Sequence, residues 1–151
     1  MAPINTKNIH RSNFLLGHRY GIDFRYDEML LTGDGEQGKA TAEFVAKDDS
    51  VAKSELQPGD GPTKEERENG DYEAIFAGTS SDGELMISSV KGDRDPGYGS
   101  TSKMLAEAAM CLLKNPELAS GGLWTPAAAL GEKLVERLEA HAGLTFEIEQ
   151  G

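Results

Sequence analysis

The stretch DYEAIFAGTSSDGELMISSVKG, residues 71–92, decides the fold of this chain. It contains two runs with the residue types of β-strands, 71–79 and 83–92, and the loop Ser80-Ser81-Asp82-Gly83 joins them. Two such runs on either side of a short loop that contains glycine are typical of a β-hairpin. The sequence therefore predicts a pair of antiparallel strands here.

A helix follows the hairpin, and a strand closes the chain. Residues 100–114, STSKMLAEAAMCLLK, are apolar nearly all round, which is typical of a buried helix. Asn115-Pro116 is expected to end it, because the residue before a proline is disfavoured in helical conformation. The stretch LTFEIE, residues 144–149, predicts the closing strand.

A second helix is predicted between these two elements, in residues 125–143. Thr125 has the position of an N-cap and Pro126 that of the first helical residue. Gly143 is expected to end the helix. The predicted core stripe is Leu130, Leu134 and Leu138, and the side chains expected to face water are Glu132, Glu136, Arg137 and Glu139.

The first half of the chain is less regular. Residues 1–21 are polar and mixed, and they predict an irregular lead-in. Residues 22–32 alternate between apolar and charged side chains, which predicts a half-buried strand. A helix over 39–47, a polar loop over 48–62 and a short helix within 63–70 are expected to follow. The alternating side chains are Ile22, Phe24 and Tyr26 on one face and Asp23, Arg25 and Asp27 on the other.

Together these elements predict the fold class. A length of 151 residues suits one domain. The order strand, helix, hairpin, helix, helix, strand indicates an α+β fold. We therefore expect a single domain over residues 1–151, with a mostly antiparallel sheet and helices packed on one face.

Composition narrows the classes of partner and site. The 15 basic and 26 acidic residues give a net charge of −11, which disfavours nucleic acid and membrane surfaces as partners. Cys111 is the lone cysteine, so disulfides and cysteine-based zinc sites are excluded. His10 and His18 lack the spacing of metal ligands, and no metal site is expected. The start of the chain lacks the apolar middle of a signal peptide, which makes a soluble cytoplasmic protein the expectation.

A glycine-rich stretch raises the question of a nucleotide. TGDGEQGKAT, residues 32–41, contains Gly33, Gly35 and Gly38 in the G-x-G-x-x-G spacing. A phosphate loop needs a hydroxyl for magnesium after its lysine, and alanine stands there. A dinucleotide fingerprint needs a βαβ unit, and the polar stretch that follows offers no second strand. We interpret the glycines as a strand-to-helix turn and expect no cofactor there.

The stretch VKGDRDPGYGSTSK, residues 90–103, has many charged and hydrogen-bonding side chains just before and within the start of a predicted helix. Helix N-termini attract anions, and arginine can hold a carboxylate through two hydrogen bonds. Alternatively, the arginine pairs with a neighbouring aspartate to stiffen the turn, and the serine caps the helix. The candidate substrate-binding residues in this stretch are Asp93, Arg94, Asp95, Tyr98 and Ser100.

A second candidate cluster lies in HRYGIDFRYDE, residues 18–28. Arg25 and Tyr26 are its candidate substrate-binding residues. In one interpretation they line a pocket, and in the other they lie on the solvent-exposed face of a strand. No catalytic residue is assigned in either cluster.

Four stretches resemble a known family. HRSNFLLGHRYGIDFRYDEMLLTG, PGDGPTKEERENGDYEAIFAG, KGDRDPGYGSTSKMLAEAAMCLL and GGLWTPAAALGEKLVERLEAHAGLTFEI follow one another through almost the whole chain. They resemble the C-terminal half of saccharopine-dehydrogenase-like oxidoreductases, in the branch that includes trans-acting enoyl reductases. DRDPGYG and TPAAALGE are the most specific pieces of the likeness.

The resemblance implies a division of labour between two domains. Members of that family bind NAD(P) on an N-terminal Rossmann domain, which this chain lacks. The resemblance therefore implies a substrate-side or dimerisation domain that is inactive without its Rossmann half. The implied partners are a Rossmann domain in the same or a companion chain, a second copy in a homodimer, and a small-molecule substrate. The alternative is a non-enzymatic binding or dimerisation module that kept the fold.

We predict that this chain alone does not bind nucleotide at residues 33–39, because Asp34 and Glu36 place two carboxylates in the loop. Calorimetric titration with ATP and with NADPH measures this, and no saturable heat is expected. A low-micromolar dissociation constant that Lys39→Ala abolishes would contradict the prediction.

Overall fold

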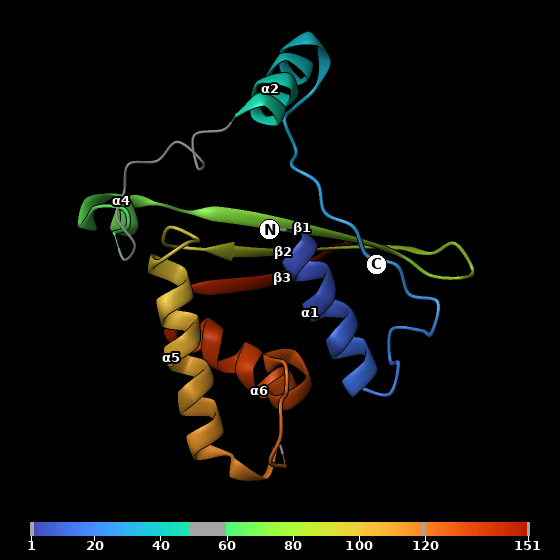
Figure 1. Cartoon of the computed structure of the whole chain (residues 1–151), viewed down its shortest axis with the longest axis vertical. Coiled ribbons are helices and arrows are strands. Elements are labelled where there is room, and N and C mark those ends of the chain that lie inside the picture. Colours follow the sequence, from blue (N-terminus) through green and yellow to red (C-terminus); the bar gives the residue numbers. More distant parts are fainter. Residues whose placement is uncertain (1, 49–59, 119, 151) are drawn as a thin grey trace.

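The computed structural model describes residues 2–48, 60–118 and 120–150 (Figure 1). Its sheet has three strands, β1 (Tyr72–Thr79), β2 (Leu85–Gly92) and β3 (Leu144–Gln150), in the order β1-β2-β3. Both pairs of neighbours are antiparallel, with Tyr72 opposite Gly92 and Gly92 opposite Leu144. The predicted hairpin and the closing strand are therefore confirmed.

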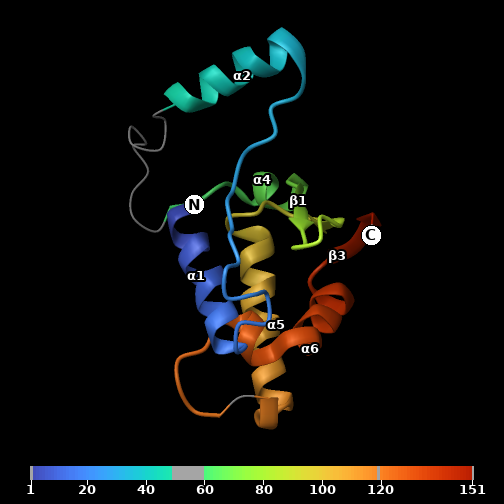
Figure 2. The same ribbon diagram turned by 90° about the vertical axis from the view of Figure 1, so that its right-hand side faces the viewer.

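Helices cover one side of this sheet. α5 (Gly99–Lys114) and α6 (Pro126–His141) lie against it, and α1 (Ala2–Leu15) lies on the same side (Figures 1 and 2). A short 3₁₀ turn, Pro116–Leu118, follows α5. The chain is thus a small single α+β domain with an antiparallel sheet and helices on one face, as the sequence predicts.

The apolar core lies where α6 meets β3. Leu138, Ala142 and Leu144 form the buried cluster. Burying a side chain of the size of leucine stabilises the folded state by about 1.5–3 kcal/mol. The partly buried side chains packed against the cluster come from the sheet and both helices: Val90, Met104, Leu134 and Phe146.

α6 begins and packs largely as predicted. Thr125 is its N-cap residue and Pro126 its first helical residue, and Leu130 and Leu138 are buried. Thr125 makes no capping hydrogen bond, because its hydroxyl bonds with that of Ser12 in α1 at 2.7 Å. Gly131 has φ of 49° and kinks the helix, a feature that the sequence pattern does not indicate.

One side chain of α6 was wrongly predicted to face water. The guanidinium of Arg137 pairs with the carboxylate of Glu107 in α5, and both side chains are 16% exposed. The sequence pattern cannot show this, since the partner lies 30 residues away. The pair joins the two helices that support the sheet.

The prediction of an irregular lead-in over residues 1–21 is wrong, because α1 occupies most of that range. Its buried side chains are polar: Ser12 and Asn13 are 6% and 4% exposed. The amide of Asn13 donates to the carbonyl of Gly21 and accepts from the backbone N–H of Tyr20. The helix is therefore held by tertiary hydrogen bonds, which apolar periodicity does not reveal.

The strand predicted over residues 22–32 is also wrong, because the chain there has no regular structure. Ile22 is largely exposed, and the ring of Phe24 packs against those of His10 and Tyr20 instead of a sheet. Alternation alone does not make a strand when no neighbour offers a ladder of hydrogen bonds. The expected helix follows as α2 (Gly35–Lys47), which stands away from the sheet (Figure 1).

Residues 48–62 were predicted to be a polar loop, and positions 49–59 of that range lie outside the described residues. The short helix after it is α4 (Lys64–Asn69). Thr63 and Glu66 make both hydrogen bonds of the capping box that their spacing predicts. Gly70 ends the helix, in an extended conformation.

We predict that Gly143→Ala destabilises the fold more than Gly83→Ala does. Both glycines have positive φ, +72° and +89°, which costs an alanine about 1 kcal/mol or more. A Cβ at position 143 would also lie 2.3 Å from the carboxyl carbon of Asp93, whereas the space at position 83 is open. Asp93 would have to leave its ion pair with Lys103.

Urea unfolding of the two variants measures the difference. We expect Gly143→Ala to lose about 1 kcal/mol more than Gly83→Ala, in line with the cost of local overpacking. Equal losses would contradict the close contact between Gly143 and Asp93.

Candidate functional site

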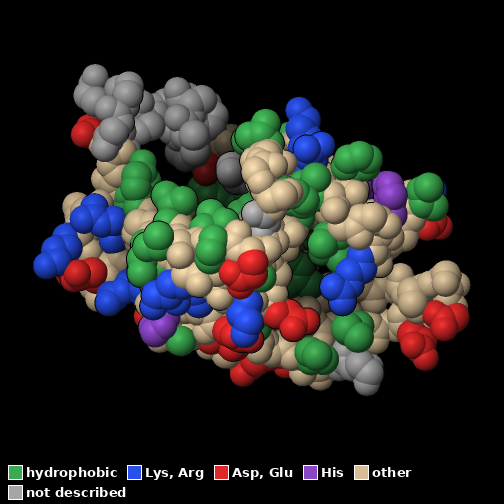
Figure 3. Space-filling view, turned by 90° about the horizontal axis from the view of Figure 1, so that it is seen from below, with side chains coloured by type: hydrophobic (Ala, Val, Ile, Leu, Met, Phe, Trp, Pro, Cys, Tyr) green, Lys and Arg blue, Asp and Glu red, His purple; other side chains and the backbone are tan. Residues whose placement is uncertain are grey.

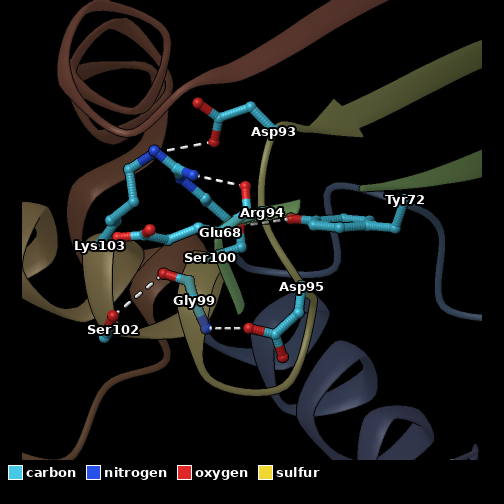
Figure 4. Close-up of polar contacts among 9 residues, drawn as sticks. All are labelled: Glu68, Tyr72, Asp93, Arg94, Asp95, Gly99, Ser100, Ser102 and Lys103. Atoms are coloured by element: carbon cyan, nitrogen blue, oxygen red, sulfur yellow. Dashed lines mark hydrogen bonds and ion pairs between the residues drawn. The ribbon is translucent and has the colours of Figure 1, made fainter. Parts of the chain in front are cut away.

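The turn between β2 and α5, residues 93–98, holds most of the candidate residues (Figure 4). It packs against the end of α4, where a Cβ on Gly70 would meet the backbone of Asp95 at 2.8 Å. The backbone N–H of Asp95 donates to the carbonyl of Arg67 at 3.2 Å. Contacts with α4 therefore hold the turn in place, in addition to hydrogen bonds within the turn itself.

Asp95 occupies the N-terminus of α5. Its carboxylate accepts hydrogen bonds from the backbone N–H groups of Gly97 and Tyr98, both at 3.0 Å, and of Gly99 at 2.5 Å. The bond from Tyr98, then those from Gly99 and Gly97, lower the pKa of Asp95 from its ordinary value of 3.8, and the charge of Arg67 adds to this. The anion site that a helix N-terminus offers is thus filled by the chain's own carboxylate.

Arg94 and Asp93 have partners on other elements. The guanidinium of Arg94 donates to the backbone carbonyl of Glu68, at the end of α4 (Figure 4). The carboxylate of Asp93 accepts from the ammonium of Lys103 at 2.8 Å. The partner of Arg94 is thus a backbone carbonyl of α4, and not the neighbouring aspartate that the alternative named.

Tyr98 and Ser100 are also engaged. The hydroxyl of Tyr98 donates to the carbonyl of Asp60 at 3.1 Å, and its ring lies against Gly61. Ser100 is fully buried, and its hydroxyl bonds with that of Tyr72 at 2.9 Å. Tyr98 stays half exposed and open to a ligand, while Ser100 serves to join α5 to β1.

Arg25 and Tyr26 lie elsewhere, in a segment that runs past the tip of the β1–β2 hairpin, at the opposite end of the sheet from this turn (Figure 1). They line a hollow of about 510 Å³ together with His10, Phe24 and Asp27. The solvent-exposed face of a strand is therefore not what forms, and binding of a substrate by Arg25 and Tyr26 stays a prediction. The structure does not bring the two candidate clusters together.

A second hollow shares Phe24 with the first. It has a volume of about 580 Å³, and its exposed lining is mostly apolar. Residues 20–24 form one side and the tip of the β1–β2 hairpin forms the other, which sequence reasoning did not anticipate. Its lining residues are Tyr20, Phe24, Gly78, Thr79, Ser80, Glu84, Leu85 and Met86.

The two hollows around Phe24 combine an apolar wall with polar groups at one end. The side chain of Arg25 is exposed and carries a fixed positive charge. Burial, followed by the hydrogen bond to Glu28 and its charge, raises the pKa of Tyr26 to about 12. Tyr26 therefore keeps its proton at neutral pH, and in this structure it donates that proton to Glu28 at 2.9 Å.

The glycine-rich stretch does not fit a nicotinamide dinucleotide. The residues before it are not a strand, so the strand–turn–helix context of that motif is missing. A Cβ on Gly38 would lie 2.0 Å from the carbonyl oxygen of Gly33. Gly38 therefore allows the first turn of α2 to pack closely against the backbone of Gly33. Within the described ranges, no three His, Cys, Asp or Glu side chains are placed to hold a metal. No helix in those ranges is both long and apolar enough to cross a bilayer.

The chain is similar over nearly all its length to part of several mycobacterial proteins. It is 34% identical to the "Putative trans-acting enoyl reductase" of Mycobacterium tuberculosis (strain ATCC 25618 / H37Rv), over 97% of the chain and 39% of that protein. It is 30% identical to the "Trans-acting enoyl reductase" of Mycobacterium bovis (strain BCG / Pasteur 1173P2), over 91% of the chain and 37% of that protein. The corresponding protein of Mycobacterium ulcerans (strain Agy99) is 28% identical, with the same coverage.

The chain thus spans about two fifths of the length of the curated relatives it matches. No protein-family model matches the sequence, and no solved structure matches it. The likeness to enoyl reductases rests on these relatives, and the wider likeness to saccharopine dehydrogenases stays a prediction.

We predict that Asp95→Asn removes an acid-dependent part of the stability. The pKa of Asp95 is lowered in the folded chain, so its contribution is present above the unfolded pKa and is lost as pH falls through the folded value. The urea midpoints of wild type and Asp95→Asn should differ at pH 6, and the difference should shrink as the pH falls below the ordinary pKa of 3.8.

Asp34→Asn is the matched control, because Asp34 is an N-cap residue whose side chain makes no capping hydrogen bond. Its urea midpoint should run parallel to that of the wild type over the same pH range. A difference for Asp95→Asn that stays constant with pH would contradict the role of its charge at the start of α5.

Proposed function

We propose that this chain is the substrate-side part of an NAD(P)-dependent oxidoreductase of the enoyl reductase type. It works with a Rossmann domain, supplied in the same chain or by a companion chain, and is inactive without it. The observation that carries the proposal is the match of 97% of this chain to 39% of a protein named as an enoyl reductase. The rest of such a protein has room for a nucleotide-binding domain, for which this chain offers no fitting loop.

The hollows around Phe24 suit the substrate of such a reaction. An enoyl group is a flat carbon–carbon double bond conjugated to a carbonyl, and its reduction places negative charge on the carbonyl oxygen. Tyr20, Phe24 and Met86 supply apolar walls for the carbon chain. Arg25 supplies a cation for the developing charge, and the protonated phenol of Tyr26 supplies a donor once it turns from Glu28.

The turn of residues 93–98 has a supporting role in this proposal. Asp95, Arg94 and Asp93 each bind a partner within the chain, whereas the ring of Tyr98 is about half exposed. That ring is the remaining candidate for a substrate contact at this end of the sheet.

Reconstitution tests the proposal. This chain is mixed with the part of the Mycobacterium tuberculosis relative that lies outside the matched region, and oxidation of NADPH or NADH is followed with an enoyl thioester such as crotonyl-CoA. Neither part alone should turn over, and the mixture should. A complex that forms but never oxidises the cofactor would favour a non-enzymatic binding module.

The same assay separates the two clusters of candidates. Arg25→Ala should raise the Michaelis constant about tenfold, which corresponds to the loss of one charged hydrogen bond. Arg94→Ala should lower stability through the lost bond to Glu68, with turnover per folded molecule unchanged. The reverse result, with Arg94→Ala alone raising the Michaelis constant, would assign the substrate to the turn.

A further inference from the structure

Positive charge is concentrated at the start of this chain, although the chain as a whole has a net charge of −11. Residues 1–22 contain Lys7, Arg11 and Arg19 and no acidic residue, because the first carboxylate of the sequence is that of Asp23. All 26 acidic residues therefore lie outside α1 and the turn that follows it. The N-terminal helix is thus the part of the chain that repels an anion least.

Helical spacing places the cations of α1 opposite its buried side. Ser12 and Asn13 are the buried residues of α1, and an α-helix has about 3.6 residues per turn. Lys7, Arg11 and Phe14 therefore share the outward side, and all three are exposed, Phe14 by 60%. On the side of the molecule where the helices lie, Figure 3 shows hydrophobic side chains at the surface beside Lys and Arg side chains. The basic face of α1 consists of Ile4, Lys7, Arg11 and Phe14, with His18 just beyond the helix.

The cations of this face have no acidic partner in the described part of the chain. Neither Lys7 nor Arg11 makes a hydrogen bond or an ion pair there, and the guanidinium of Arg11 lies over the ring of Phe14, 5.7 Å from its centre. Three lysines of the sheet and the helices beneath it each pair with a carboxylate instead: Lys91, Lys103 and Lys133. The charges of the basic face are therefore available to a molecule outside the chain.

The ring of Phe14 is held in place by its neighbours. The imidazole of His18 packs edge-on against it, with ring centres 5.8 Å apart. His18 has φ of 63°, a conformation that residues other than glycine adopt uncommonly, and such strained residues cluster at binding and active sites. Its N–H donates to the carbonyl of Asn13 at 2.7 Å, and its carbonyl accepts from the N–H of Gly21 at 2.9 Å. The ring and its cation are thus ordered in advance, which lowers the entropic cost of binding.

We propose that the basic face of α1 binds an acidic segment of a separate protein, with carboxylates beside Lys7 and Arg11 and an apolar side chain against Phe14. Ile4 and Phe14 lie ten residues apart, or about 15 Å along the helix axis. No residue of the face lines either of the hollows around Phe24, whereas sites for small molecules are concave. A peptide segment can follow a convex face of this length and contact its cations and apolar side chains together.

Charge narrows the class of partner. A nucleic acid or an anionic bilayer extends beyond the face and meets the acidic remainder of the chain, which repels it. A short acidic segment can stay within the face. Charge mainly raises the rate at which separate molecules meet, whereas a tethered domain is already at high effective concentration. A separate protein therefore gains most from this face.

This inference does not rest on the proposed reductase role, because it is measured as binding and not as turnover. The probe is a fluorescein-labelled peptide of about 15 residues built from glutamate and leucine, whose helix matches the length of the face. Fluorescence anisotropy with the whole 151-residue chain should give a dissociation constant on the order of 10 µM, typical of a small interface. Binding should weaken as NaCl rises from about 0.05 to about 0.2 M, because salt screens exposed charges. The same peptide with glutamine in place of glutamate should not bind.

Matched variants locate the contact. Arg11→Glu should raise the dissociation constant about tenfold or more, through the loss and reversal of one charged contact. Lys114→Glu makes the same change of charge at the exposed end of α5 and should alter the constant by less than about twofold. Phe14→Ala should weaken binding, whereas Phe44→Ala, at a 72% exposed position of α2, should not.

NMR signals of the histidines give an independent location. The histidines of the chain are His10, His18 and His141. The ring signals of His18 should move and saturate with the peptide, whereas those of His141, in the last turn of α6, should stay unchanged. Thermal unfolding of each variant confirms that it is folded before its binding is interpreted.

Several results would overturn the proposal. One is a wild type that does not bind the acidic peptide, or a Lys114→Glu variant that loses as much affinity as Arg11→Glu. Another is a face that binds a different occupant: self-association of the chain, or binding of oligothymidylate or phosphatidylglycerol vesicles, that Arg11→Glu abolishes. Displacement of the peptide by the remainder of the Mycobacterium tuberculosis relative would also exclude a separate partner. Arg11→Glu should leave turnover in the reconstituted reductase assay unchanged, so the two proposals fail independently.

Discussion

The contact between Gly143 and the carboxylate of Asp93 joins the parts of this domain. Gly143 has no side chain and adopts a left-handed conformation, so the turn from α6 into β3 passes directly over Asp93. Asp93 follows β2, and its ion pair reaches Lys103 in the first turns of α5. Leu144, the next residue, is thereby placed opposite Gly92 and into the core with Leu138. The junction therefore brings together the end of β2, the first turns of α5 and the turn from α6 into β3.

Elements that carry their own local signals were predictable from the sequence. The hairpin has its strands and its turn within 71–92, and the capping box has its two partners three residues apart. α1 was missed because Ser12 and Asn13 are buried by hydrogen bonds to distant atoms, which no periodicity records. Residues 22–32 alternate like a strand and yet have none beside them, since strand pairing is settled by the rest of the fold.

The candidate sites also combine features that the sequence indicates with contacts that only the folded chain creates. The residue types of the turn at 93–98 predicted polar side chains next to a helix N-terminus, and α5 does begin there, while their role towards a substrate stays a prediction. The partners of these side chains are main-chain atoms, which a sequence pattern does not identify. Asp95 binds three backbone N–H groups, and Arg94 binds the carbonyl of Glu68. The hollow around Phe24 needs the hairpin tip to meet residues 20–24, and that meeting exists only in the folded chain.

The residue pattern of 100–114 predicted a buried helix, and this prediction is wrong for the outer face of α5, where Leu105 and Leu113 are 71% and 74% exposed. An apolar residue pattern reports that a side chain avoids water, and it does not report which molecule excludes the water. Cys111, on the inner side of α5, is buried by the domain's own α6 side, while Leu105 and Leu113 on the outer side are not. The same helix therefore packs one face against its own domain and leaves apolar side chains of the other face exposed. In a chain that spans two fifths of its relatives' length, the apolar hollow near Phe24, with polar groups at one end, has the kind of lining that suits a small molecule.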